Sequence, residues 1–272
     1  MKGIAFGQFY PTDSLLHRLD PRAKLIMALL YVVTSFLCKN VLGFAAMLAL
    51  AFLLVLISHI PLGTVLRSIR PVLLIMLFTA LLHIFMTAGD TLLFEWRFIH
   101  IYREGLYHAA FMMVRIFVLI VGMGMFMTYT TTPIMLTDAL EQLLAPLKVL
   151  HVPVHEFAMM MTIALRFIPT LMEETDKIMA AQKARGADFT SGSLLSRAKA
   201  LIPILIPLFV SAFRRADELA TAMECRCYHG GDGRTRMTVL HYRLSDFVAL
   251  AVVLACGAAL IFANRYAFVF SM

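Results

Sequence analysis

Charged side chains are scarce in this sequence of 272 residues, since Asp, Glu, Lys and Arg together make up only 15% of it. Hydrophobic residues make up 61%, and the mean hydropathy is +0.82. A chain with so much apolar surface and so few charges has too little polar surface to fold as an ordinary soluble domain. The composition therefore predicts an integral membrane protein.

The common catalytic motifs are also missing. No Gly-Lys dipeptide occurs anywhere, so the phosphate-binding Walker A loop cannot be present. Neither the His-Glu-x-x-His zinc protease motif nor the Gly-x-Ser-x-Gly nucleophile motif occurs. We therefore expect a chain that is not an enzyme and binds no cofactor itself.

Cysteine is rare, with four residues that do not form a disulfide framework. Cys38 and Cys256 lie in apolar stretches. Cys225-x-Cys227-x-His229 supplies three ligands at most and matches none of the usual zinc spacings. We expect small residues at a helix end there, and no metal site.

Long apolar stretches dominate the rest of the chain, and five of them are long enough, or nearly so, to span a bilayer. They are residues 25–38, 41–66, 71–89, 106–128 and 247–264. This pattern predicts an all-α membrane protein with about five transmembrane helices. Arg115 is the one charge inside a span, and we expect it to face the protein interior or to snorkel.

Basic residues are distributed unevenly around these spans. With the N-terminus in the cytoplasm, 19 of the 24 Lys and Arg residues lie on the cytoplasmic side. The positive-inside rule therefore favours this orientation in the cell membrane. The net charge of +7 is then a sign of topology, and we expect no nucleic-acid partner.

Three regions follow from this topology. Residues 1–128 hold the first four spans after an amphipathic lead-in, residues 129–243 form a cytoplasmic region of long helices, and residues 244–272 hold the last span. In the lead-in, Asp20 and Pro21 suit the N-cap and first position of a helix. We interpret Arg22 and Lys24 as basic anchors at the membrane edge.

The cytoplasmic region contains two long helical patterns that begin apolar and end charged, residues 154–185 and 194–228. Pro169 is expected to bend the first without ending it. A repeat relates their ends, because Asp176 and Arg185 recur 41 positions later as Asp217 and Arg226. Each of these two helical patterns, which we call the arms, therefore ends in an arginine.

Small residues flank both arginines, in Ala184-Arg185-Gly186 and in Cys225-Arg226-Cys227. An arginine at a helix C-terminus can simply cap its own helix. A pair of arginines with small neighbours on both sides instead favours docking, because each tip can enter a groove while its guanidinium binds a carboxylate. We predict two similar partner subunits.

The chain resembles the transmembrane T component of energy-coupling factor (ECF) transporters, the EcfT/CbiQ family of ABC-type importers. The resemblance rests on Gly7-Gln8, on residues 13–24, on Arg166-Phe167-Ile168-Pro169, on the two arginine tips and on residues 214–224. The family's second Ala-Arg-Gly motif is replaced here by Cys225-Arg226-Cys227. Without that glycine, we expect the left-handed cap to move to Gly230.

The resemblance implies that Ala184, Arg185, Gly186, Cys225, Arg226 and Cys227 dock onto two cytoplasmic ATPases. Those partners would bind ATP and Mg. A separate substrate-binding S component would receive the movement and release a vitamin or a metal ion inward. A stand-alone secondary transporter or channel is the alternative, but it would require several ionisable residues within the spans.

Overall fold

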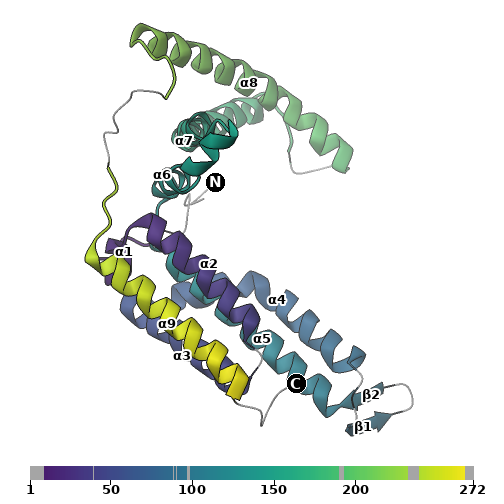
Figure 1. Cartoon of the computed structure of the whole chain (residues 1–272). Helices are drawn as coiled ribbons and strands as arrows, with labels where there is room; N and C mark the ends of the chain where they lie inside the picture. The colour runs from purple at the N-terminus through teal and green to yellow at the C-terminus, as the bar shows by residue number, and fades with distance from the viewer. Residues whose placement is uncertain are drawn as a thin grey trace. The chain divides into compact units, whose positions relative to one another are not determined.

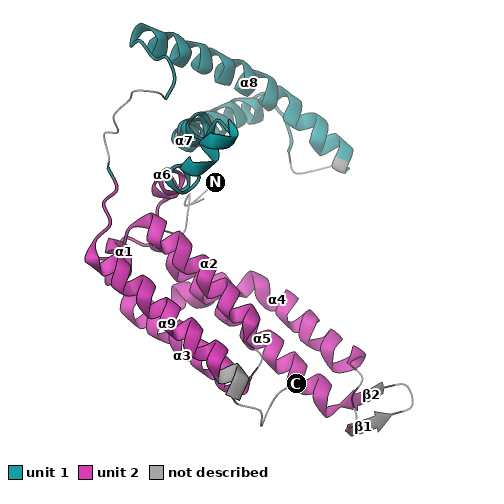
Figure 2. Cartoon of the chain, in the orientation of Figure 1, with its two compact units in different colours: residues 1–5, 140–239 teal, residues 6–139, 240–272 magenta. Residues whose placement is uncertain are grey.

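The computed structural model describes residues 9–38, 40–87, 89, 91–96, 99–189, 193–231 and 239–266. Gly7 and Gln8 of the lead-in, residues 190–192 of the turn between the arms, and residues 232–238 lie outside the described residues. The chain divides into two compact units (Figure 2): unit 1 comprises residues 1–5 and 140–239, and unit 2 comprises residues 6–139 and 240–272.

Unit 2 is a bundle of helices (Figure 1). Its elements are α1 (Leu15–Arg18), α2 (Pro21–Leu37), α3 (Val41–Ser58), α4 (Leu62–Met86), α5 (Arg103–Met123), the π-helical turn η1 (Gly124–Thr128), the first part of α6 (Pro133–Leu143) and α9 (Leu244–Tyr266). A small antiparallel hairpin, β1 (Leu92–Trp96) with β2 (Ile99–Tyr102), joins α4 to α5. The sequence analysis did not predict it.

Unit 1 contains the rest of α6, a short 3-10 helix η2 (Ala145–Leu150), and the two long helices α7 (Val154–Ala184) and α8 (Leu194–Cys225). Pro146 falls at the start of η2, just after α6 has ended. Pro169 lies inside α7, which continues through it as expected. Pro203 and Pro207 likewise lie inside α8.

Five of the described helices are long and apolar enough to cross a membrane: α3, α4, α5 with η1, α8 and α9. The prediction of an all-α, multi-pass membrane protein is confirmed. By composition this set includes α8, which the sequence analysis interpreted as a cytoplasmic arm. The first predicted span corresponds to α2, which has 17 residues and packs against α5 and α9.

The core of unit 2 forms where α2, α3 and α5 meet. Tyr31 is 1% exposed, and its hydroxyl donates to the Val118 carbonyl at 3.0 Å. Its ring lies directly on Gly122, where an added Cβ atom would clash with the ring. Glycine at this position therefore lets α2 and α5 approach each other closely.

Arg115 faces the protein, one of the two placements expected. Its Nη2 donates to the Cys38 carbonyl at 3.2 Å, and its guanidinium lies 5.2 Å from the centre of the Phe44 ring. Both contacts offset the cost of a charge within a span.

Candidate docking site

The first predicted tip is the C-terminal end of α7. Arg185 is the C-cap, and Gly186 follows it with a φ of 86°. The Gly186 N–H donates to the Lys183 carbonyl and the Ala187 N–H donates to the Gln182 carbonyl, both at 3.0 Å. This pair of hydrogen bonds is the Schellman motif, which satisfies helix carbonyls that would otherwise lack partners.

The second predicted tip ends α8 in the same way. Arg226 is the C-cap, and Cys227 follows it with a φ of 56°. The Cys227 N–H donates to the Glu224 carbonyl at 2.9 Å, and the Tyr228 N–H donates to the Met223 carbonyl at 3.1 Å. The Schellman motif is therefore present at both tips.

The expectation that the cap moves to Gly230 is wrong. Gly230 does adopt a positive φ of 100°, but it lies beyond a helix end that Cys227 has already capped. The two hydrogen bonds to helix carbonyls fix the left-handed backbone at position 227. They are formed despite the cost of about 1–2 kcal/mol that a residue with a side chain bears in this conformation.

The two arginines occupy matching positions. Arg185 has φ −86° and ψ 7°, and Arg226 has φ −94° and ψ 15°. All six predicted docking residues are exposed: Ala184, Arg185, Gly186, Cys225, Arg226 and Cys227. Within the described parts of unit 1, neither guanidinium forms an ion pair or a hydrogen bond. The arginine side chains are thus not used to cap their own helices.

The helices α7 and α8 cross before they reach these tips (Figure 1). At the crossing, Arg215 Nη2 lies 3.1 Å from Glu174 Oε2. A hydrogen bond from Ser211, followed by the positive charge of Arg215, lowers the pKa of Glu174. The Glu174 carboxylate is therefore held in its charged form, which the ion pair requires.

Apolar residues line the rest of the crossing around a cavity of about 300 Å³. They include Ile163, Phe167 and Leu171 from α7, and Ala212, Ala216, Leu219 and Met223 from α8. Alanines on α8 leave room for the larger side chains of α7. The contact is thus built from packing with one ion pair beside it.

The crossing lies at the same distance from both tips along the chain. Arg185 follows Glu174 by eleven residues, and Arg226 follows Arg215 by eleven. At 1.5 Å per helical residue, each tip lies about 16 Å beyond the ion pair. The sequence analysis missed this pair, although the 41-residue offset between Arg185 and Arg226 also relates Glu174 to Arg215.

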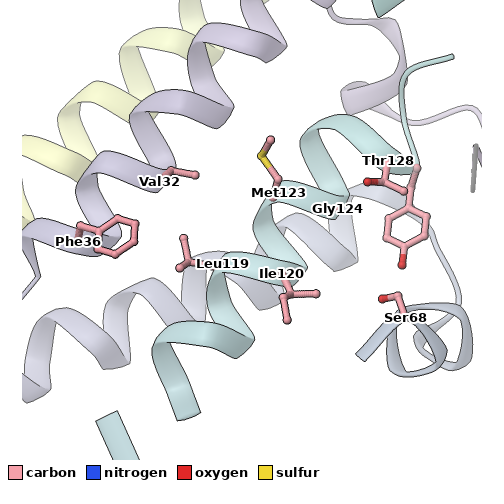
Figure 3. Close-up of a pocket in the computed structure, with 9 residues that line it drawn as sticks. Val32, Phe36, Ser68, Leu119, Ile120, Met123, Gly124 and Thr128 are labelled. Atoms are coloured by element: carbon pink, nitrogen blue, oxygen red, sulfur yellow. The ribbon is translucent and has the colours of Figure 1, made fainter. Parts of the chain in front are cut away.

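A second cavity lies in unit 2, among α2, α4 and α5 (Figure 3). Its volume is about 590 Å³. It is lined by Val32, Phe36, Ser68, Leu119, Ile120, Met123, Gly124, Thr128 and Tyr129. This lining is mostly apolar and contains no acidic or basic side chain, so it offers no charged group to bind an ion.

The sequence is similar to those of known proteins of one family. The family CbiQ, described as a cobalt transport protein, matches residues 12–238. The energy-coupling factor transporter transmembrane protein EcfT of Clostridium kluyveri is 52% identical over 259 residues, covering 94% of this chain and 96% of the relative. EcfT of Bacillus subtilis is 47% identical over 262 residues, covering 96% of this chain and 98% of the relative. The matched residues include both arginine-tipped helices, and the chain therefore belongs to the CbiQ/EcfT family of transmembrane components of energy-coupling factor transporters.

Proposed function

We propose that this chain is the energy-coupling subunit that connects two cytoplasmic ATPases to a substrate-binding S component. The observation that carries the proposal is the pair of matching helix ends, each with an exposed arginine that has no partner within the described parts of unit 1. Two equivalent ends suit two similar partners.

Each tip has the chemistry for docking onto an acidic groove. The planar guanidinium of Arg185 or Arg226 can bind a carboxylate through two parallel hydrogen bonds. The residues on both sides of each arginine are small, so the helix end can enter a groove without steric hindrance. They are Ala184 and Gly186 at one tip and Cys225 and Cys227 at the other. We propose that each arginine pairs with a carboxylate on one ATPase.

This docking gives the ATPases, this chain and the S component different roles. The ATPases bind ATP and Mg and hydrolyse ATP, whereas this chain binds no cofactor and catalyses no reaction. Closure of the ATPases moves the two tips, and the helices pass that movement to the membrane unit and to the S component. The S component then releases a vitamin or a metal ion into the cell.

The distribution of charge supports a matching orientation in the cell membrane. With the N-terminus in the cytoplasm, 19 of 24 basic residues lie on the cytoplasmic side, and so do both arginine tips. The tips are then on the side where ATP is available.

The docking proposal is tested with Arg185→Ala, Arg226→Ala and the double variant. Co-purification of both ATPases and ATP-driven uptake are measured in the full complex. Each single variant is expected to weaken assembly, and the double variant is expected to abolish uptake. Arg214→Ala is the matched control, because Arg214 is an exposed arginine of α8 away from both tips.

Unchanged assembly and uptake in the double variant would refute the docking role. A second measurement addresses the alternative of a stand-alone transporter or channel. The isolated chain, reconstituted in lipid vesicles, is expected to carry no vitamin or metal ion across the membrane. Transport by the chain alone would contradict the proposed function.

A further inference from the structure

The lead-in motif Asp20-Pro21-Arg22-Ala23-Lys24 lies in unit 2 and contacts the segments that precede and follow residues 140–239, the part of unit 1 that contains α7 and α8. The chain leaves unit 2 within α6, between Ala139 and Leu140, and returns between Val239 and Leu240. The contacts described below all lie within unit 2.

Lys24 holds the outgoing connection. Its side chain is buried, and Nζ donates to the Thr130 carbonyl at 2.9 Å and to the His17 carbonyl at 3.3 Å. Thr130 is itself 2% exposed and lies three residues before α6 begins at Pro133. Lys24 thereby ties the start of α2 to the segment from which α6 leaves.

Burial of this ammonium group is costly. It lowers the pKa of Lys24 from 10.5 to about 8, although the charges of Asp246 and Asp20 partly oppose the shift. A basic anchor at the membrane edge, as the sequence analysis interpreted Lys24, would keep its charge in water. The buried position indicates that the hydrogen bonds of Nζ are the function of this side chain.

Arg22 holds the returning connection. Its Nη2 donates to the Leu240 carbonyl at 3.0 Å, and its guanidinium lies 3.9 Å from the centre of the Tyr242 ring. Asp20 orients the guanidinium by accepting from Nε at 3.1 Å and from Nη2 at 2.9 Å. Burial raises the pKa of Asp20, but the hydrogen bonds from the side chain and backbone of Arg22, together with the charges of Arg22 and Lys24, outweigh burial and lower the pKa.

Asp246 links the returning segment to the lead-in. This buried carboxylate accepts from the Asp20 backbone N–H at 2.9 Å and from the Arg243 backbone N–H at 2.7 Å. The first bond joins residues 226 positions apart in the sequence. Residues 240–243 are therefore fixed on α2 before α9 begins at Leu244.

We infer that Asp20, Arg22, Lys24 and Asp246 form a clamp that fixes to unit 2 the two segments that flank residues 140–239. Movement of α7 and α8 is then passed to unit 2 and is not absorbed by loose flanking segments. This inference rests on the proposed coupling function. The four residues are positioning residues, since their hydrogen bonds hold the backbone of the two flanking segments.

The clamp predicts uncoupling rather than loss of assembly. In the complete complex reconstituted in vesicles, Arg22→Gln is expected to leave ATP hydrolysis near the wild-type rate. The amount of solute taken up per ATP hydrolysed is expected to fall roughly two- to thirtyfold, the range typical of broken coupling networks. Arg18→Gln is the matched control, because Arg18 is an exposed arginine of the same lead-in.

Arg22→Lys provides a second variant. Lysine keeps a positive charge beside Asp20 but lacks the fork that reaches the carboxylate and the Leu240 carbonyl together. It is expected to assemble and to show the same lowered uptake per ATP. A wild-type ratio in both variants overturns the clamp, and so does a parallel fall of hydrolysis and uptake or a failure of both variants to assemble, because these results indicate structural support alone.

The outcome is distinct from a failure of the proposed function. If the wild-type complex shows no ATP-driven uptake, or if Arg185→Ala with Arg226→Ala leaves both assembly and uptake unchanged, the coupling function itself fails. If the wild type couples and both Arg22 variants couple equally well, only the clamp fails.

Discussion

Replacing Cys227 by glycine is expected to strengthen the second helix end. Cys227 has a φ of 56°, a conformation that costs a residue with a side chain about 1–2 kcal/mol. Glycine removes this strain but adds about 0.5–1 kcal/mol of conformational freedom in the unfolded chain. The difference leaves a net stabilisation of up to about 1.5 kcal/mol.

The reverse substitution at the first tip provides the matched control. A side chain at Gly186 would meet no atom within 4 Å, so Gly186→Ala introduces backbone strain at a φ of 86° without a steric clash. Alanine adds backbone strain at positive φ and removes the conformational freedom of glycine in the unfolded chain. The net effect is expected to make the C-terminal end of α7 less stable. Glycine at 227 and alanine at 186 should therefore change local stability in opposite directions.

Hydrogen exchange of the capping amides measures both effects. The donors to follow are the N–H groups of residues 186 and 187 at one tip and of residues 227 and 228 at the other. A stabilisation of 1 kcal/mol slows exchange through local opening about fivefold. Faster exchange at residues 227 and 228 in Cys227→Gly, or slower exchange at residues 186 and 187 in Gly186→Ala, would refute the reasoning.

Two further predictions concern unit 2. Gly122→Ala should lower the thermal unfolding temperature in detergent, because the added Cβ meets the Tyr31 ring and overpacking typically costs about 1–3 kcal/mol; an unchanged temperature would contradict the close packing. Acidification should loosen the lead-in, because burial lowers the pKa of His17 below its usual 6.5 and outweighs the hydrogen bond to the Tyr10 carbonyl, which raises it. Stability is then complete above pH 6.5 and is lost as the pH falls from 6.5 towards the lowered pKa. Limited proteolysis of the lead-in from pH 7.5 to 5.5 checks this, with His17→Gln expected to remove the pH dependence.

Local features of the arms could be predicted from the sequence. The lengths of α7 and α8, the continuation of α7 through Pro169 and the left-handed Gly186 all follow from helical spacing and from the conformational freedom of glycine. The cap at Cys227 could not, because residue preference favours Gly230. The hydrogen bonds to the Met223 and Glu224 carbonyls decide the matter, and they form only once the helix end is folded.

Contacts between distant segments could not be predicted from the sequence. Arg215 could pair within its own helix, and only the crossing of α7 and α8 selects Glu174. Arg22 and Lys24 stand next to an apolar stretch, which is typical of membrane anchors, but the partner carbonyl of Arg22 lies 218 residues away. The β-hairpin at residues 92–102 was missed because its strands are short and lie between two strong helical signals.

The equal spacing of the two tips from the crossing of α7 and α8 has a mechanical consequence. Because both tips lie equally far from the crossing, equal forces on the two tips exert equal torques about it. If two similar ATPases pull on both tips as proposed, the contact between Glu174 and Arg215 stays in place while α7 and α8 turn about it. Equal forces on the two tips then produce a rotation and no sideways displacement.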